Sequence, residues 1–250
     1  MVEAATIKPS FGYAAILVLL AATATALVTV GRIGLGRQVL TASLRAVVQL
    51  AAVSAVIVVV LRSWGLTTAF IAVMLSIAAM TSARRIGQGR QALLTGAAIA
   101  AGALPVVGLL LASGVVPRTP IAVVPIAGIL IGGAMTATSL AGRRAMDTLR
   151  TRFGEVEAAM ALGFLDRDAA LLVCRPTVAD ALVPALDQTR TVGLVTLPGA
   201  FVGVLLGGAS PVEAGAAQLL VLVGLLAVEA TAVLATVELI ARGLIPWPAR

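Results

Sequence analysis

Charged and amide side chains stand at a few positions inside long apolar stretches of this sequence. Arg45 and Gln49 lie one helical turn apart within the stretch 38–61, and Glu229 lies near the middle of 214–241. An ionisable group at such depth is costly unless it faces protein or water. We therefore expect these residues to line a transport pathway, where Glu229 would bind a cation, carry a proton or pair with Arg45. The alternatives are a snorkelling side chain for Arg45 and a buried structural acid for Glu229.

Asp187 and Arg190 form a second candidate pair at the start of another apolar stretch. They are three residues apart and share one helical face, which would suit a salt bridge at a gate. An acid near a helix N-terminus is also favourable without any function. Pro198 follows in the same stretch and is a hinge candidate for the pathway, because proline interrupts a helix and exposes carbonyl groups.

The chain has few residues that could bind a transition metal or the phosphates of a nucleotide. It has no histidine and one cysteine, Cys174, so no transition-metal ligand set is visible and any metal site stays unknown. Its single lysine, Lys8, excludes a GxxxxGK[ST] phosphate loop. We therefore expect no cofactor in this chain and no enzymatic activity of its own.

The elements that must position these side chains are membrane helices. The chain is 60% hydrophobic and 12% charged, with a mean hydropathy of +1.09, whereas about a quarter of the residues of soluble domains are charged. Helices are required because a lipid-exposed backbone has to satisfy its own hydrogen bonds. The sequence predicts one all-α, multi-pass domain, 1–250, in the cell (inner or plasma) membrane. About seven spans are predicted, at 11–30, 38–61, 67–83, 92–112, 120–141, 190–207 and 214–241.

The net charge of +7 is explained by membrane topology rather than by nucleic-acid binding, since basic residues gather in cytoplasmic loops. One side of the membrane carries only Lys8, Arg62 and Arg118. The N-terminus is therefore predicted outside and the C-terminus in the cytoplasm. Most arginines then fall on the cytoplasmic side, in the loops 31–37, 84–91 and 142–189 and at the C-terminus.

The loop 142–189 is the long polar interval of the chain. Within 155–173 apolar residues recur at three- and four-residue spacings, and the pattern breaks near Gly163. This predicts two short amphipathic helices with a bend between them. Helices lying on the membrane surface would share the pattern.

The spacing inside this loop resembles the ATPase-contacting loop of ABC-importer permeases. That loop has Glu-Ala-Ala, a glycine four residues on, and a later Ile-x-Leu-Pro, whereas this chain has Arg175 in place of the leucine. The resemblance implies that a cytoplasmic ABC ATPase docks here, and a glycine turn and surface charges suit a docking knob. The implied coupling residues are Glu157, Ala158, Ala159, Gly163 and Pro176.

Small residues form two candidate packing faces, Gly128 with Gly132 and the series Gly199, Gly203 and Gly207. Such residues let membrane helices approach closely. The partner helix could belong to this chain or to a second copy.

Further motifs extend the resemblance over about residues 36–240. They are Arg45 to Leu50, Pro125 to Gly128 with Gly133 to Met135, Ala181 to Asp187, Thr191 to Gly199 and Gly207 to Ala214. Together they are similar to the FetB-type permease family, the membrane half of iron-export ABC transporters, related to plant permeases linked to aluminium tolerance. Relatives often have asparagine where this chain has Gly133, and Tyr-Gln where it has Ala217-Gln218. The resemblance implies a homodimeric permease that exports iron or another metal cation, with ATP and Mg bound by a separate ATPase.

Two alternatives stay open. An ion-coupled secondary transporter would use Arg45 and Glu229 as its coupled pair, although such folds often show inverted repeats that are not visible here. An ABC importer permease would need an extracytoplasmic binding protein, for which the short outer loops leave little docking surface.

Overall fold

The computed structural model describes residues 10–87 and 93–247, and these form an all-helical chain. Seven helical segments are long and apolar enough to cross a membrane, which confirms the predicted fold class and number of spans. The helices are α1 (Phe11–Val30), α2 (Gly36–Val60), α3 (Trp64–Ile86), α4 (Thr95–Ala112), α5 (Pro120–Thr151), α6 (Phe153–Ala161), α7 (Asp166–Val178), η2 (Ala179–Leu182), α8 (Val183–Thr191), α9 (Gly199–Leu206) and α10 (Pro211–Ala241).

The chain divides into two compact units, which meet in sequence between Arg62 and Ser63. The first unit is the hairpin of α1 and α2. Gly36 brings the two helices close, because a Cβ atom there would lie 2.6 Å from the Thr29 hydroxyl. No residue of α1 is buried, which suits a helix whose apolar side chains face lipid.

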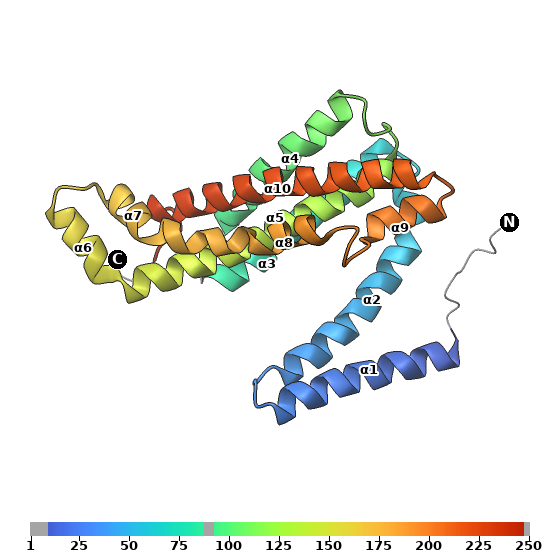
Figure 1. Cartoon of the computed structure of the whole chain (residues 1–250), viewed down its shortest axis with the longest axis horizontal. Helices are drawn as coiled ribbons and strands as arrows, with labels where there is room; N and C mark the ends of the chain where they lie inside the picture. Colours follow the sequence, from blue (N-terminus) through green and yellow to red (C-terminus); the bar gives the residue numbers. More distant parts are fainter. Residues whose placement is uncertain (1–9, 88–92, 248–250) are drawn as a thin grey trace. The chain divides into compact units, whose positions relative to one another are not determined.

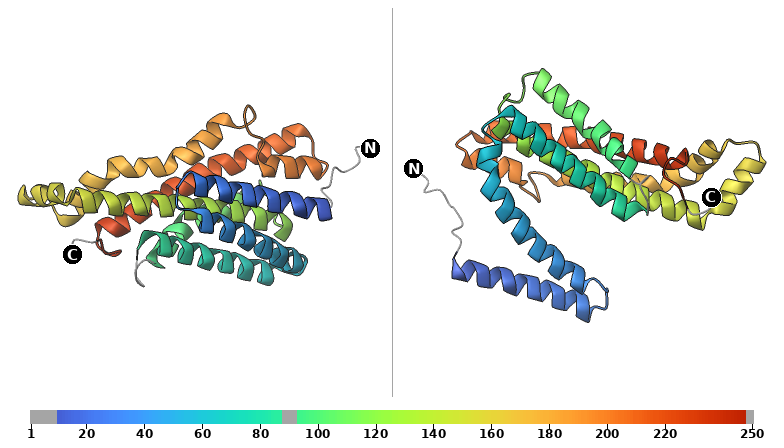
Figure 2. Two further views of the ribbon diagram at one scale, coloured as in Figure 1. Left: turned by 90° about the horizontal axis from the view of Figure 1, so that it is seen from below. Right: turned by 180° about the vertical axis from the view of Figure 1, so that it is seen from behind.

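The second unit is built around α5 and α10, which run side by side (Figure 1). The contact face of α5 carries small side chains at helical spacing, which allow the two helices to approach closely. Close contact matters because the hydrophobic effect does not drive helix association within lipid. Helices α3 and α4 pack on the same core (Figure 2). Ser82 of α3 hydrogen-bonds to Ser139 of α5 at 3.1 Å. The fully buried alanines of α5 are Ala127, Ala134, Ala137, Ala141 and Ala145.

Both central helices are longer than a bilayer requires. α5 has 32 residues and α10 has 31, which at 1.5 Å per residue gives lengths of about 48 and 46 Å, against a hydrocarbon thickness of about 30 Å. The C-terminal turns of α5 carry exposed Arg143, Arg144 and Arg150. These turns therefore extend beyond the hydrocarbon and support the elements that follow.

The predicted sixth span, 190–207, is wrong as a continuous helix. The helical segment long enough to cross is Asp166–Thr191, made of α7, η2 and α8. The chain then leaves the helix, with Gly193 at a φ of +80° and Pro198 preceding α9. A residue with a left-handed backbone cannot continue an α-helix, and proline has no N–H to donate to the helical hydrogen bonds. The expected interruption at Pro198 is confirmed, and α9 has only 8 residues.

We predict that Gly102→Val in α4 will lower thermal stability. A Cβ atom at Gly102 would lie 2.6 Å from the Val228 carbonyl oxygen of α10, and backbone cannot move aside as a side chain can. Overpacking of this kind costs about 1–3 kcal/mol. Gly108→Val in the same helix is the control, because no atom lies within 4 Å of its Cβ position. Equal melting temperatures of the two purified variants would contradict this packing.

Candidate functional site

The predicted docking loop is a helical hairpin at the C-terminal ends of α5 and α10. α6 follows α5 after one residue, and α7 returns alongside the end of α5, where Thr148 and Thr177 share a hydrogen bond of 2.9 Å. The two short helices and the bend near Gly163 are confirmed. We call residues 153–178 the α6–α7 hairpin.

Gly163 makes the bend possible. It has a φ of +94°, a conformation that favours glycine. Its N–H donates to the Met160 carbonyl at 2.9 Å, and the Phe164 N–H donates to the Ala159 carbonyl at 3.2 Å. This pair of bonds is a Schellman motif, which satisfies the last carbonyl groups of α6. The turn is therefore a defined structure rather than a loose connection.

An arginine fixes the start of α6. Arg152 donates two hydrogen bonds to Glu155, of which the Nε to Oε1 bond is 2.6 Å. These bonds hold the pKa of the Glu155 carboxyl below its ordinary value. The stabilisation is present above the ordinary carboxyl pKa and is lost as the pH falls through the lowered pKa. The junction of α5 and α6 is thus fixed at neutral pH.

The hairpin has one buried and one exposed side. Val156 and Ala159 of α6 face the protein, whereas Glu157 and Ala158 are exposed. At the start of the hairpin, the ring of Phe153 makes an edge contact with the ring of Trp247, and the two ring centroids are 5.8 Å apart.

Apolar side chains also stand exposed at the tip of the hairpin, Leu162 at 81% and Leu165 at 73%. The tip therefore offers a surface of mixed charge and apolar character. A macromolecular partner could cover this surface.

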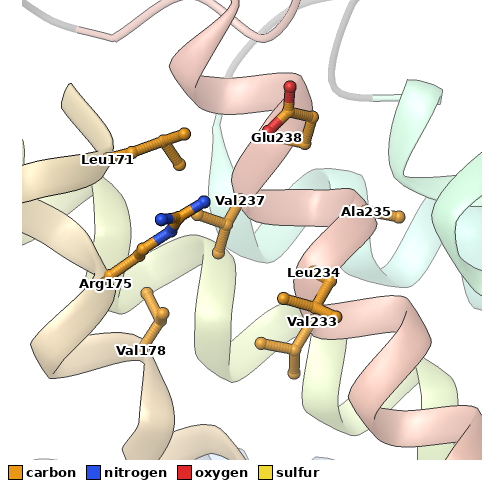
Figure 3. Close-up of a pocket in the computed structure, with 8 residues that line it drawn as sticks. All are labelled: Leu171, Arg175, Val178, Val233, Leu234, Ala235, Val237 and Glu238. Atoms are coloured by element: carbon orange, nitrogen blue, oxygen red, sulfur yellow. The ribbon is translucent and has the colours of Figure 1, made fainter. Parts of the chain in front are cut away.

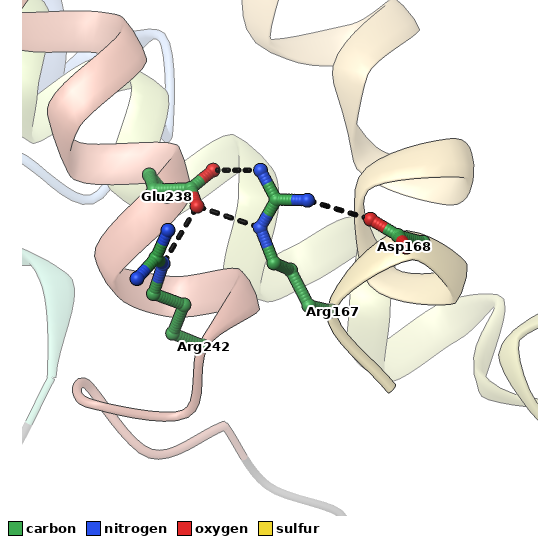
Figure 4. A network of polar contacts seen from close by, with 4 residues as sticks. All are labelled: Arg167, Asp168, Glu238 and Arg242. Carbon is green, nitrogen blue, oxygen red and sulfur yellow. Dashed lines mark hydrogen bonds and ion pairs between the residues drawn. The ribbon is translucent and has the colours of Figure 1, made fainter. Parts of the chain in front are cut away.

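An ion-pair network ties the hairpin to α10 (Figure 4). Arg167, in the first turn of α7, contacts Glu238 with its Nε to Oε1 at 2.6 Å and its Nη2 to Oε2 at 3.0 Å. The same guanidinium reaches Asp168 at 2.6 Å, and Arg242 reaches Glu238 at 2.7 Å. A bidentate arginine–carboxylate pair fixes orientation as well as distance. The beginning of α7 is therefore joined directly to the last turns of α10.

Sequence reasoning missed this junction. The Glu238–Arg242 spacing of four residues is a visible helical pair, but Arg167 is 71 residues from Glu238 and no local pattern connects them.

A groove of about 330 Å³ lies beside the network, between α7 and α10 (Figure 3). Arg175, which replaces the leucine of the importer pattern, lies on the α7 side of this groove, and Glu238 lies on the α10 side. Pro176, a predicted coupling residue, is exposed within α7.

The predicted pathway residues are divided between the two units. Arg45 and Gln49 lie on α2 in the first unit and are exposed there. Asp187 and Arg190 pair on α8 at 3.7 Å, as their spacing predicts, but both side chains are mostly exposed. Glu229 is buried in the second unit, against Gly133 of α5. Across residues 10–87 and 93–247, no three His, Cys, Asp or Glu side chains gather as a metal site.

A cavity of about 890 Å³ lies between the first half of α5, α9 and the start of α10. Its lining includes Pro125, Gly199 and Gly203. The Cβ positions of Gly132, Gly199 and Gly203 have no neighbour within 4 Å in the described part of the chain. Close packing at these three residues therefore stays a prediction.

The other two predicted packing glycines differ from these three. A Cβ atom at Gly128 would lie 2.9 Å from Met74 of α3, so this glycine does meet a neighbouring helix. At Gly207 the nearest atoms are carbonyl groups of α9 itself, because this residue caps that helix.

The fold defines the class as an all-helical, multi-pass membrane protein with seven candidate spans. Residues 10–245 match a family model described as "Uncharacterised protein family (UPF0014)", and the chain belongs to this family. No solved structure matches it.

Three relatives show what the chain is similar to, and the names of two of them concern metals. The chain is 34% identical to the UPF0014 membrane protein STAR2 of Oryza sativa subsp. japonica, over 91% of this chain and 79% of STAR2. It is 39% identical to the protein ALUMINUM SENSITIVE 3 of Arabidopsis thaliana, over 60% and 55% of the two chains. It is 33% identical to the probable iron export permease protein FetB of Escherichia coli (strain K12), over 50% and 48%.

We predict that Gly163→Ala will loosen the α6–α7 hairpin. An alanine in the left-handed region costs about 1–2 kcal/mol per residue, so hydrogen–deuterium exchange of the α6 amides should become faster. Gly154→Ala is the matched control, since its Cβ position is open and a helical alanine is favoured over glycine by about 0.5–1 kcal/mol. Unchanged exchange in Gly163→Ala would show that the turn does not hold the hairpin.

Proposed function

We propose that this chain is the membrane subunit of an ABC transporter and that the α6–α7 hairpin is the docking element for a separate ATPase. One observation carries the proposal: a short, defined hairpin projects from the two longest helices and is ion-paired to one of them through Arg167 and Glu238. A docking element must transmit force, and this one has both a capped turn and, in the first turn of α7, a charged junction with α10.

The composition of the hairpin tip supports a protein partner. Leu162 and Leu165 stand exposed beside Glu157 and Ala158, at the end of α5 that extends beyond a bilayer thickness. Exposed apolar residues with a charged neighbour are typical of interaction surfaces. The cleft of an ATPase subunit would cover the leucines and give Glu157 a basic partner. Glu157, Ala158 and Ala159 with Gly163 and Pro176 remain the proposed coupling residues.

The junction supplies a route for the movement. A displacement of the hairpin by the ATPase would act on Arg167, then on Glu238, and so on the C-terminal turns of α10. α10 packs along α5, so a shift of the C-terminal end of α10 would displace side chains in the core of the second unit. ATP and Mg would bind to the ATPase subunits, and this chain would supply the pathway.

The other parts of the proposal follow from topology and from the relatives. Basic residues near the hairpin favour a cytoplasmic position for it and for the C-terminus, with the N-terminus outside and the protein in the cell membrane. Two permease copies would form the pathway, and the open faces at Gly132 and Gly199 offer small residues to a second copy. The relationship to a probable iron export permease suggests a metal cation, with iron as the first candidate.

We predict that Glu157→Arg will abolish copurification with the ABC ATPase encoded nearest to this gene and stimulation of its ATP turnover. The variant reverses the exposed charge of the tip without touching a buried residue. Asp180→Arg is the control, because Asp180 lies in η2, away from the tip, and its contact with Arg144 is a long one of 3.8 Å between exposed side chains.

Each result of the copurification experiment has a defined meaning. A complex that survives Glu157→Arg unchanged would overturn docking through the tip. Failure of the unmodified chain to bind any ATPase would remove the ABC proposal and favour the ion-coupled carrier. Stimulation of turnover by ferrous iron would support iron as the substrate, and indifference to it would keep the mechanism while removing iron.

A further inference from the structure

One buried face of α10 carries three polar side chains, Gln218, Glu229 and Thr236. They are separated by 11 and 7 residues, which are close to whole numbers of helical turns, so they lie along one line. Their exposed fractions are 4%, 7% and 0%. Polar side chains on the buried face of a membrane helix need hydrogen-bond or ionic partners inside the protein. This requirement distinguishes α10 from a helix whose buried face is entirely apolar.

Two of the three side chains find partners within the chain. The side-chain carbonyl of Gln218 accepts a hydrogen bond from the Phe201 N–H of α9 at 3.2 Å. The hydroxyl of Thr236 donates to the Ala232 carbonyl at 2.7 Å and lies 3.4 Å from the Thr138 hydroxyl of α5. Glu229 makes no hydrogen bond or ion pair with any residue that the structure describes. It is the member of the line that has no polar partner among the described residues.

The Glu229 carboxyl occupies space on α5 that is free because residue 133 is a glycine. A Cβ atom at Gly133 would lie 2.7 Å from Glu229 Oε1 and would also collide with the Leu225 side chain. The carboxyl group therefore sits in a notch that only glycine leaves open. Gly132, the residue before it, has no atom within 4 Å of its Cβ position. The notch is therefore specific to Gly133.

Among the described residues of α4, α5 and α10, no basic side chain lies at this level. Along α10, Glu229 is about 27 Å from Pro211 and about 18 Å from Ala241 at 1.5 Å per residue. α4 has no charged residue, and the first arginine of α5, Arg143, is ten residues beyond Gly133, about 15 Å. The Arg167 and Arg242 pair is engaged by Glu238 near the end of the helix.

A cavity approaches this position from one end of the unit but does not reach it, because neither Gly133 nor Glu229 is among its lining residues. The cavity of about 890 Å³ extends along α5 as far as Ile129, one helical turn before Gly133. A carboxyl group buried without a counter-ion is costly in a medium of low dielectric, and an arriving cation removes that cost.

We propose that Glu229, seated in the Gly133 notch, is a transient ligand for a hard metal cation that passes through the second unit. Carboxylate oxygen is the ligand type that hard cations prefer. One carboxylate is a weak site, which suits transport because the ion must leave as readily as it enters. The inference rests on the proposed transport function and names the residue that its cargo contacts.

The test uses the full-length chain purified without any ATPase, so that it stays informative if the ABC assignment fails. An apolar carbodiimide that modifies carboxyl groups inside membranes is added with and without Mn²⁺ or anaerobic Fe²⁺, and the modified peptide is measured by mass spectrometry. We expect modification of Glu229 that falls as the metal ion is added. Gly133→Ala displaces the carboxyl group and should raise the half-protecting metal concentration at least about tenfold, since a charged ligand is misplaced. Gly132→Ala should behave as the unmodified chain.

Modification of Glu229 that neither metal ion reduces would overturn the proposal and make Glu229 a structural acid, as would a carboxyl group that the reagent never reaches. Equal protection in Gly133→Ala and Gly132→Ala would also contradict the notch as its site. Metal protection of a chain that binds no ATPase would keep this site and remove the ABC mechanism. An ATPase complex without metal protection would do the reverse.

Discussion

The close packing of α10 on α5 is the constraint on which the rest of the second unit depends. Lipid is as apolar as the side chains that these helices bury, so association rests on close contact and on hydrogen bonds. The fully buried alanines from Ala127 to Ala145 give α5 a narrow face, and Gly133 deepens it at one point. The same contact fixes the depth of Glu229 and carries the ends of both helices far enough to support the α6–α7 hairpin.

Because α5 and α10 both continue past the thickness of a bilayer, the hairpin stands on two rigid supports. Its turn is closed by the hydrogen bonds around Gly163, and the first turn of α7 is joined to α10 by Arg167 and Glu238. An element of this kind can move as one body, which is what an ATPase-driven step would require. The proposed docking surface and the buried carboxyl group then lie at two levels of one helix system, and α10 is the element that they share.

Hydropathy and local spacing predict much of this arrangement. The number of spans, the short helices on either side of Gly163 and the Asp187–Arg190 pair follow from periodicity. The sixth span does not, since an apolar run at 190–207 hides the helix break at Gly193, although the break at Pro198 is expected. The contacts of Glu229 with Gly133 and of Arg167 with Glu238 join distant parts of the chain. No local pattern indicates such contacts, because they depend on how the helices pack.

The central claim is that an ATPase subunit contacts the tip of the hairpin. The most direct measurement is photo-crosslinking in cells from an amino acid placed at Ala158, which is exposed on α6, with Val115, near the opposite end of α5, as the reference position. The account predicts an adduct with the ATPase from position 158 and none from position 115. Equal adducts from both positions, or adducts with lipid alone at position 158, would contradict it.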